Sequence, residues 1–411
     1  MLYDVVVVGA RCAGSATALL LARAGHRVLL VDRACFPRDT LSTLYIQQRG
    51  VAYLARWGLL ARVAAVCPAL DRISYRIGDV QLEGRPRPVD GVASAYAPRR
   101  YCLDSILAEA AVAAGAEFRD GCTVDDLVHA GDRVTGVRLR GARGAGPAVT
   151  ERARLVIGAD GMRSTVAARA GAATLIEHPS KTCVYYTFWA GVTDHFEFYE
   201  AAGQCVGAVP TSDGATLVQA YFPQADFARV RAAAMSAYLE NARSVAPGLH
   251  ARMLAGGRLD RLYGTGDQRN FFRSGAGRGW ALVGDAGHHC DSITACGISH
   301  AFIQAQSLAD HVSGVLDDAP ALDEALSRYA RERYELLISD YHHTLSVAQL
   351  ALPPHRIAML REVAADPRRT TDFFSAMAGA PVRGTQTGRQ ESFPRAIAWF
   401  RQNRPASPAP C

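Results

Sequence analysis

The chain has 411 residues, of which 49% are hydrophobic and 20% are charged, and its formal net charge is +6. This is an ordinary globular composition for two or three folding units, so it excludes fibrous architectures and disorder over most of the chain. The excess positive charge is spread along the chain rather than gathered in a block, so we expect no nucleic-acid partner. No apolar run reaches the roughly 20 residues of a membrane span, and we expect neither a span nor an export signal.

The ten cysteines form no Cys-x-x-Cys pair and no Cys/His spacing that suits zinc. We therefore expect reduced thiols in a cytoplasmic protein, and no metal site.

The first 32 residues have the pattern of a βαβ unit that binds a dinucleotide. Residues 3–8 and 28–31 are short apolar strands, and residues 13–24 between them are an Ala/Leu-rich helix. The turn after the first strand has the first and third glycines of the fingerprint, but an arginine replaces the middle one. An aspartate that can accept both ribose hydroxyls ends the second strand. The pattern predicts a nucleotide site made of Gly9, Arg11, Cys12, Ala13, Gly14, Asp32 and Arg33.

Two more apolar strands stop at turns rich in glycine and aspartate. Residues 155–158 run into Asp160 and Gly161, and residues 280–283 run into Gly284 and Asp285. On open parallel sheets, ligands lie at the carboxyl ends of the strands. We therefore predict that three strand ends converge on one crevice.

With these three motifs in this order, residues 1–345 resemble FAD-dependent monooxygenases of the para-hydroxybenzoate hydroxylase-like class, the group A hydroxylases that tailor natural products. The resemblance implies that the first turn and Asp32 bind FAD and that Asp285 holds the ribityl chain. It also implies that the Asp160-Gly161 turn serves flavin and nicotinamide together, and that either Arg99 or Arg100 lies near the cofactor.

A polar stretch and a helix follow Asp285. A helix from about residue 300 to 312, preceded by Gly297 and Ile298, would direct its positive end toward the flavin pyrimidine ring. Ser292 stands where the family usually has proline, which predicts a looser loop beside the isoalloxazine. His288 and His289 are candidates for a general base, and a His or Cys here is also a candidate for covalent flavin attachment. The alternative is a loop of packed side chains beneath the ring, so the catalytic residues stay unassigned.

Residues 183–222 change to short alternating strands, at 183–192, 196–199, 205–209 and 215–222, the last after a hairpin turn at 212–214. Residues 72–77 are expected to join the same sheet. Its many aromatic side chains suit a floor over a flat apolar ligand, although strands favour aromatic residues without any ligand. The candidate substrate-binding residues are Tyr186, Phe188, Trp189, Phe198 and Tyr221.

The predicted fold class is α/β, with a Rossmann-like FAD-binding domain, an inserted mixed or antiparallel β-sheet substrate domain and a helical C-terminal segment. The FAD-binding domain is discontinuous and comprises 1–70, 98–175 and 270–345, and the substrate domain comprises 71–97 and 176–269. The C-terminal segment spans 346–404, with helices expected at 356–364 and 393–400, and residues 405–411 are expected to be a disordered tail.

The resemblance implies an enzyme in which NADPH or NADH, bound transiently, reduces FAD. Molecular oxygen then forms a flavin C4a-hydroperoxide that hydroxylates or epoxidises an aromatic or polycyclic secondary metabolite. Two alternatives stay open: a reductase of the geranylgeranyl type, which needs a long aliphatic cavity, and a FAD-binding cyclase or oxidase without oxygenation. A flavin-dependent halogenase is disfavoured because its Trp-x-Trp-x-x-Pro stretch is missing and Lys181 is the only lysine. Monomer and homodimer are both compatible with the sequence.

Overall fold

The computed structural model describes residues 2–141 and 147–380. Its first sheet has eight strands, and the strands of its central part run parallel in the order β16-β17-β8-β1-β2-β5, with only β16 antiparallel to its neighbour. Strands β6 and β7 extend it by pairing β7 with β8. The bounds are β1 (Leu2–Val8), β2 (Val28–Val31), β5 (Glu117–Arg119), β6 (Thr123–Ala130), β7 (Arg133–Arg140), β8 (Val149–Gly158), β16 (Ala276–Gly277) and β17 (Trp280–Leu282).

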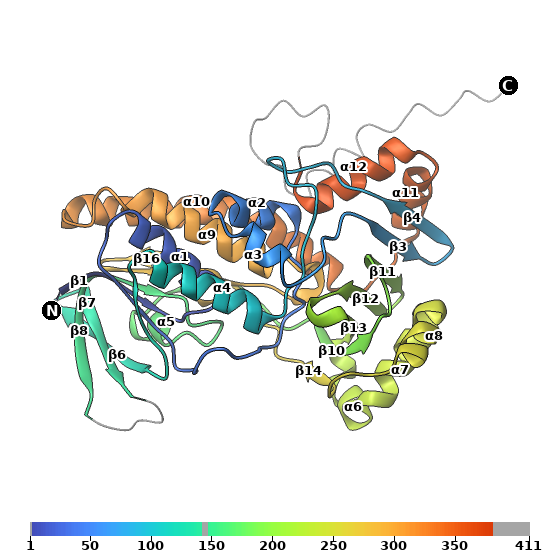
Figure 1. Cartoon of the computed structure of the whole chain (residues 1–411), viewed down its shortest axis with the longest axis horizontal. Coiled ribbons are helices and arrows are strands. Elements are labelled where there is room, and N and C mark those ends of the chain that lie inside the picture. The colour runs from blue at the N-terminus through green and yellow to red at the C-terminus, as the bar shows by residue number, and fades with distance from the viewer. Residues whose placement is uncertain (1, 142–146, 381–411) are drawn as a thin grey trace.

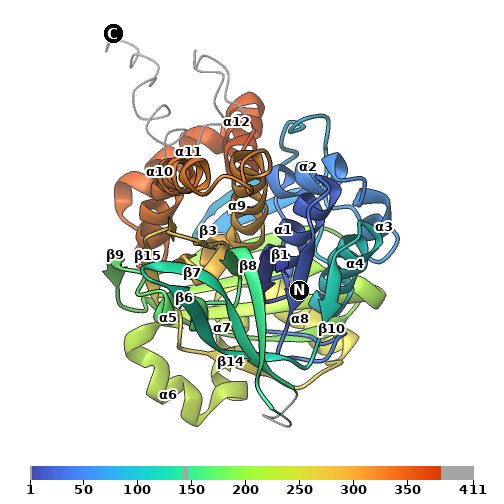
Figure 2. The ribbon, with the colours of Figure 1, turned by 90° about the vertical axis from the view of Figure 1, so that its left-hand side faces the viewer.

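Helices cover one face of this sheet, and Figure 2 shows α1, α9 and α10 above β1 and β8, with β6 and β7 to the left of β8. Helix α1 packs against both α4 and α9, and α9 packs against α10. Because α1 is an almost wholly buried Ala/Leu helix, it can lie between the sheet and the other helices. The helices on this side are α1 (Cys12–Arg23), α2 (Gln48–Arg56), α3 (Leu60–Ala64), α4 (Arg100–Ala113), α9 (Gly297–Val312) and α10 (Ala319–Val347), and the short α5 (Thr165–Arg169) follows β8.

The second sheet has seven strands in the order β14-β10-β13-β12-β11-β3-β4, and all neighbours are antiparallel except β11 and β3. It forms the other half of the molecule in Figure 1. The bounds are β3 (Ile73–Ile77), β4 (Val80–Gly84), β10 (Thr182–Ala190), β11 (Phe196–Ala201), β12 (Gln204–Pro210), β13 (Ala215–Pro223) and β14 (Tyr263–Thr265). The strands expected at 72–77 and within 183–222 are therefore present and share one sheet.

The two faces of the seven-stranded sheet are covered by different helices (Figure 1). We call the outer face the one under α6 (Phe227–Ala232), α7 (Ala234–Val245) and α8 (Pro247–Gly256). The inner face is the one toward α10, α11 (Pro354–Ala364) and α12 (Pro367–Ala378). Helix α11 confirms the helix expected at 356–364. The helix expected at 393–400 and the tail at 405–411 lie outside the described residues.

A small third sheet, in the order β18-β15-β9, connects the two larger ones. It contains β9 (Thr174–His178), β15 (Asn270–Arg273) and β18 (His288–His289). The two histidines thus form a strand rather than a loop, because they pair with Phe271 and Phe272 of β15. Strand β9 runs across the predicted domain boundary at residue 175, and the domain division stays a prediction.

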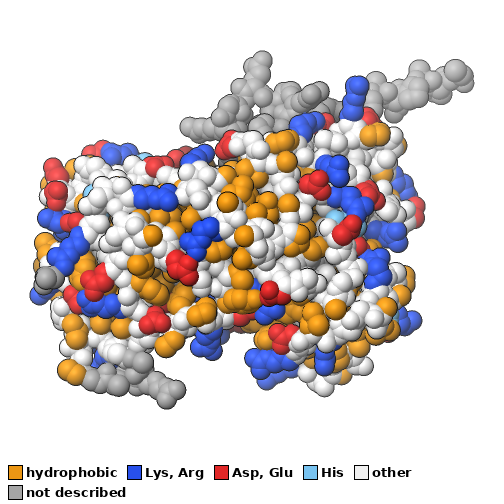
Figure 3. All heavy atoms as spheres, viewed as in Figure 1, with side chains coloured by type: hydrophobic (Ala, Val, Ile, Leu, Met, Phe, Trp, Pro, Cys, Tyr) orange, Lys and Arg blue, Asp and Glu red, His pale blue; other side chains and the backbone are white. Residues whose placement is uncertain are grey.

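Charged side chains of both signs are interspersed on the face of the molecule seen in Figure 3, with hydrophobic side chains gathered near its middle. Within residues 2–141 and 147–380, no helix is both long enough and apolar enough to cross a membrane.

Candidate cofactor and substrate site

The three strand ends predicted to converge do so, because β17, β8 and β1 are adjacent parallel strands. A Cβ atom at Gly14 would overlap the carbonyl oxygen of Gly9, and one at Gly9, whose φ is +103°, would overlap that of Ala159. Gly284 has a φ of +60°, and a Cβ there would lie 2.7 Å from the Cβ of Ala13. The three turns therefore pack directly on one another, and side chains larger than glycine would separate them.

Arg11, which replaces the middle glycine, turns toward α4. Its Nη1 lies 3.1 Å from Oδ2 of the buried Asp104, to which Arg100 also donates at 3.0 Å. Cys12 donates its thiol proton to the same carboxylate at 3.2 Å. Two guanidinium groups thus share one carboxylate beside the N-terminus of α1, which leaves net positive charge where a diphosphate would bind.

Arg99 and Arg100 point to different parts of the molecule. Arg100 lies close enough to Asp285 for their charges to interact. The guanidinium of Arg99 instead lies 3.7 Å from the ring centroid of Phe188 and pairs with Asp39 at 2.6 Å. Of the two arginines, Arg100 is therefore beside the strand ends, whereas Arg99 contacts the seven-stranded sheet.

The three aspartates at the strand ends differ in how they are engaged. Asp32 is buried and accepts hydrogen bonds from the backbone of Ala10 at 2.7 Å and of Ala34 at 2.8 Å. Asp160 caps the start of α5 through the backbone N–H of Thr165, and burial raises its pKa. Asp285 is exposed and makes no side-chain hydrogen bond to any described residue. Asp285 is thus the carboxylate most accessible to a ligand, and Arg33 is also exposed.

The turn at Ser292 is held firmly, contrary to the looser loop expected from the missing proline. The Gln268 amide oxygen accepts hydrogen bonds from the Ser292 backbone N–H at 3.2 Å and from the Ser292 hydroxyl at 2.6 Å. The Tyr221 hydroxyl lies 3.0 Å from the Ser292 hydroxyl oxygen. Asp291 accepts from Thr182 Oγ1 at 2.8 Å, and burial raises the Asp291 pKa to about 6. Hydrogen bonds therefore restrain this turn where a proline ring does so in the family.

Helix α9 begins at Gly297, three residues before the expected position, and Ile298 is buried in the core between α1 and α9. The helix begins directly after the restrained turn, and the residues just before it, 293–296, line the cavity described below. Gly297 and Ile298, which were expected to precede the helix, are instead its first two residues.

His288 is buried against Phe272, and its Nε2 lies 3.1 Å from the Cys290 sulfur. Burial, together with the neighbouring His300, lowers the His288 pKa, so its imidazole is neutral. Nδ1 of His289 contacts the carbonyl oxygen of Arg269. Base catalysis and covalent attachment at these residues stay predictions.

A cavity with about 980 Å³ of space between its walls, part of it open to solvent, lies on the inner face of the seven-stranded sheet. We call it the substrate cavity. Strands β3, β11 and β13, helices α10, α11 and α12 and the turn at 293–296 line it. Its aromatic walls are Tyr45, Tyr75, Phe196, Phe198 and Phe373.

The candidate substrate residues divide between the two faces of the sheet. Phe198 lines the cavity. Tyr186, Phe188 and Tyr221 share its face but contact other groups: Tyr186 stacks on a tyrosine of β14, Phe188 lies under an arginine, and Tyr221 reaches the turn at 292.

Trp189 lies on the outer face and does not line the cavity. Its indole N–H donates to the Tyr238 hydroxyl at 2.9 Å, within the core under α7 and α8. The physical reason is the alternation of side chains along a strand, which forbids Phe188 and Trp189 from facing the same side.

Charged side chains from distant segments also border the cavity, and the sequence analysis did not identify them. Arg49 of α2 pairs with Asp340 of α10 at 2.7 Å, and His300 of α9 lies 3.0 Å from the same carboxylate. On the opposite wall, Arg356 pairs with Glu200 at 2.9 Å. No local motif marks the two arginines, because each lies more than 150 positions from its carboxylate partner.

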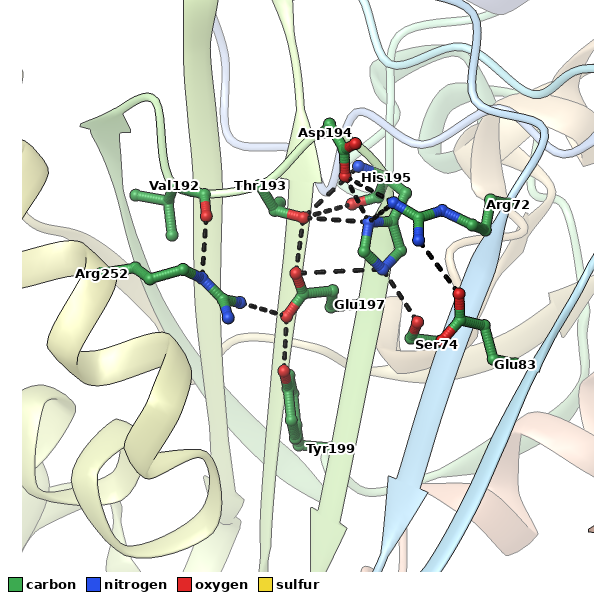
Figure 4. Close-up of polar contacts among 10 residues, drawn as sticks. All are labelled: Arg72, Ser74, Glu83, Val192, Thr193, Asp194, His195, Glu197, Tyr199 and Arg252. Atoms are coloured by element: carbon green, nitrogen blue, oxygen red, sulfur yellow. Dashed lines mark hydrogen bonds and ion pairs between the residues drawn. The ribbon is translucent and has the colours of Figure 1, made fainter.

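A second polar cluster occupies the outer face (Figure 4). His195 contacts Ser74 at 2.8 Å and Asp194 at 2.6 Å, and Arg72 also lies 2.9 Å from the Nδ1 atom of His195. Glu197 binds Arg252 of α8 at 2.5 Å. Because its contacts tie β3 and α8 to β11, we assign this cluster to holding the sheet and its helices together.

Comparison with known proteins decides the family. The family described as "FAD binding domain" matches residues 2–337. The chain belongs to this FAD-binding family. The resemblance and the α/β fold class predicted from the three motifs are thereby confirmed.

The curated relatives match part of the chain. Kynurenine 3-monooxygenase of Salinispora arenicola is 37% identical over 177 residues, which cover 39% of this chain and 37% of that protein. Menaquinone reductase of Mycolicibacterium smegmatis is 37% identical over 165 residues, 40% of this chain and 38% of that protein. A digeranylgeranylglycerophospholipid reductase of Methanothermobacter thermautotrophicus is 33% identical over 205 residues, 48% of this chain and 50% of that protein. The matched segments thus span half or less of these relatives.

Solved structures share the fold over most of the chain. PqsL of Pseudomonas aeruginosa, described as a probable FAD-dependent monooxygenase, has a TM-score of 0.74 at 21% identity and covers 88% of this chain and 100% of its own. The flavin-dependent brominase Bmp2 has a TM-score of 0.76 at 17% identity and covers 98% of this chain and 100% of its own. At these identities the likeness establishes the fold alone.

Proposed function

We propose that the protein is a FAD-dependent, NAD(P)H-consuming monooxygenase that acts on an aromatic or polycyclic small molecule. The observation that carries this proposal is the position of the aromatic-walled cavity, which borders the turn from which α9 begins. The predicted flavin ring would lie at this turn. The similarity of part of the chain to kynurenine 3-monooxygenase supports the same activity.

The residues present fit FAD. The N-terminus of α1 and the shared positive charge of Arg11 and Arg100 suit a diphosphate, Asp32 suits a ribose, and the exposed Asp285 suits the ribityl hydroxyls. When bound, FAD accepts electrons from the nicotinamide and activates oxygen. The chain itself orients the substrate between aromatic walls and restricts water around it.

The first experiment follows anaerobic bleaching of the flavin by NADPH and by NADH, with and without phenolic and polycyclic compounds. A monooxygenase of this type should be reduced much faster when one compound is present and should give an oxygenated product when air is admitted. Reduction followed by peroxide without product would indicate an oxidase. If neither nicotinamide bleaches the flavin under any condition, the monooxygenase proposal fails. Reduction of an isoprenoid double bond would favour the reductase.

The cofactor assignment has its own test. We expect Asp285→Ala to be purified with little FAD, and Asp32→Ala to bind FAD about 1–3 kcal/mol more weakly because a charge-assisted hydrogen bond is lost. Asp317→Ala is the control, since this exposed carboxylate pairs with Arg154 of β8. Full FAD occupancy in Asp285→Ala would remove that residue from the site.

A further inference from the structure

We infer that the substrate cavity takes an uncharged hydroxylated aromatic compound, and that Gln219 accepts the hydrogen bond from its hydroxyl group. This inference rests on the proposed function, because it treats the cavity as the substrate site. It adds the chemical class of the substrate and a residue that recognises it.

Gln219 carries an unused hydrogen-bond acceptor at the cavity. It lies in the middle of β13, is only 3% exposed, and lines the cavity. Its Oε1 is buried and has no hydrogen-bond partner among the described residues. An unsatisfied buried oxygen is costly and rare in folded proteins, so an unpaired amide oxygen on a residue that lines a cavity points to a ligand that donates a hydrogen bond.

The neighbouring strand keeps this amide in place. Gly207 of β12 is the cross-strand partner of Gln219, and a Cβ at Gly207 would lie 2.8 Å from the Gln219 amide nitrogen. The Gln219 amide therefore occupies the space that a side chain at position 207 would need, and a residue larger than glycine there would displace it. Gly207 thus acts as a positioning residue for Gln219.

The charges around the cavity compensate one another. Each of the two lining arginines, Arg49 and Arg356, already has a carboxylate partner at the cavity wall, at 2.7 Å and 2.9 Å. Burial lowers the pKa of His343 to about 4 and raises that of Cys296, so both side chains are neutral near pH 7. A carboxylate ligand would lose its hydration on entering the cavity and would find no unpaired cation there. To pair with an arginine, it would have to separate a buried ion pair, which costs free energy.

The walls suit a flat ring. Tyr45 stacks on Phe196 with ring centroids 4.5 Å apart, and Tyr75 stacks on Phe373 at 6.1 Å. A ring lying against these aromatic walls gains dispersion and hydrophobic free energy without any charge. A hydrogen bond from its phenolic O–H to Gln219 would also raise the electron density of the ring, which favours attack on an electrophilic oxygen.

The test uses the FAD-loaded protein and three bicyclic probes of matched shape: naphthalene, 2-naphthol and 3-hydroxy-2-naphthoate. Calorimetry measures binding directly, without requiring flavin chemistry. We expect 2-naphthol to bind about tenfold more tightly than naphthalene and at least tenfold more tightly than the carboxylate. In Gln219→Leu, 2-naphthol should bind no better than naphthalene. Gly207→Ala should reduce the same difference, because it displaces the amide.

Thr216→Val is the matched control, since this buried residue lies on the same strand and faces the outer side. It should bind all three probes as the wild type does. Tighter binding of the carboxylate, no binding of 2-naphthol, or an unchanged preference in Gln219→Leu would overturn the inference. Binding as expected without nicotinamide-dependent oxygenation of any compound would leave the inference intact and reject the monooxygenase proposal.

Discussion

Two glutamates of β11 face opposite sides of one sheet and meet different surroundings. Glu197 on the outer face binds Arg252 of α8 and the Thr193 hydroxyl, each at 2.5 Å (Figure 4). Glu200 on the inner face binds Arg356 of α11 at 2.9 Å and borders the substrate cavity. Both are buried carboxylates paired with an arginine from a covering helix.

What differs is how completely the covering elements fill the space. On the outer face, Trp189, Tyr238 and their neighbours form a continuous core under α7 and α8. On the inner face, α10, α11 and α12 leave a cavity between themselves and the sheet. The same ion-pair chemistry therefore occurs in a packed core on one face and at a cavity wall on the other, so residue type alone does not reveal function.

The largest expected effect is a loss of stability when a large side chain is removed from the filled core of the outer face. Trp189→Ala should lower the free energy of unfolding by about 3–5 kcal/mol, because it empties a filled core. It should leave 2-naphthol affinity unchanged. Phe198→Ala should cost less stability, since the ring already borders a cavity, but should weaken 2-naphthol binding several-fold. Urea unfolding and calorimetry on both variants measure the two quantities. A loss of 2-naphthol affinity in Trp189→Ala larger than in Phe198→Ala would reverse the assignment of the faces.

Removing the arginine of each ion pair should change the charge of the cavity only on the inner face. Arg356→Gln and Arg252→Gln should each lower the free energy of unfolding, by about 2–3 and about 1–2 kcal/mol, because each leaves a buried glutamate without its cation. Only Arg356→Gln makes the cavity negatively charged. It should therefore bind the cationic probe 2-naphthylmethylamine about tenfold more tightly than the wild type, whereas Arg252→Gln should not. Calorimetric titration with this amine is the measurement, and equal affinities in the two variants would contradict the comparison.

The dinucleotide edge could be predicted from the sequence because its constraints are local. Gly9 and Gly14 lie within one turn, and each glycine is required by the backbone carbonyl that its Cβ would overlap. Asp285 follows its strand directly. Such geometry recurs with fixed spacing, so a short stretch of sequence is sufficient to recognise it.

The substrate cavity could not be predicted in the same way. Arg49 lies 291 positions from its partner Asp340, and Arg356 lies 156 positions from its partner Glu200, so only the tertiary fold brings these pairs to one cavity. The pattern of short strands in 183–222 correctly predicted a sheet, but the aromatic composition of these strands does not show which side chains face the same side. Phe198 and Trp189 were therefore equally good candidates until the two faces could be distinguished.

The smallest expected effect concerns pH and the inner face alone. His343 is neutral in the folded protein because burial lowers its pKa to about 4, whereas an unfolded chain takes up a proton near pH 6.5. Protonation therefore favours the unfolded state, and this contribution to stability is lost as the pH falls from about 6.5 toward 4. His343→Leu should reduce the loss in the free energy of unfolding by about 1–2 kcal/mol between pH 6.5 and 5. Urea unfolding at a series of pH values measures it, and the difference between wild type and variant should be constant above pH 7.5, where the imidazole is neutral in both states. A difference that does not change with pH would mean that His343 affects stability through packing alone.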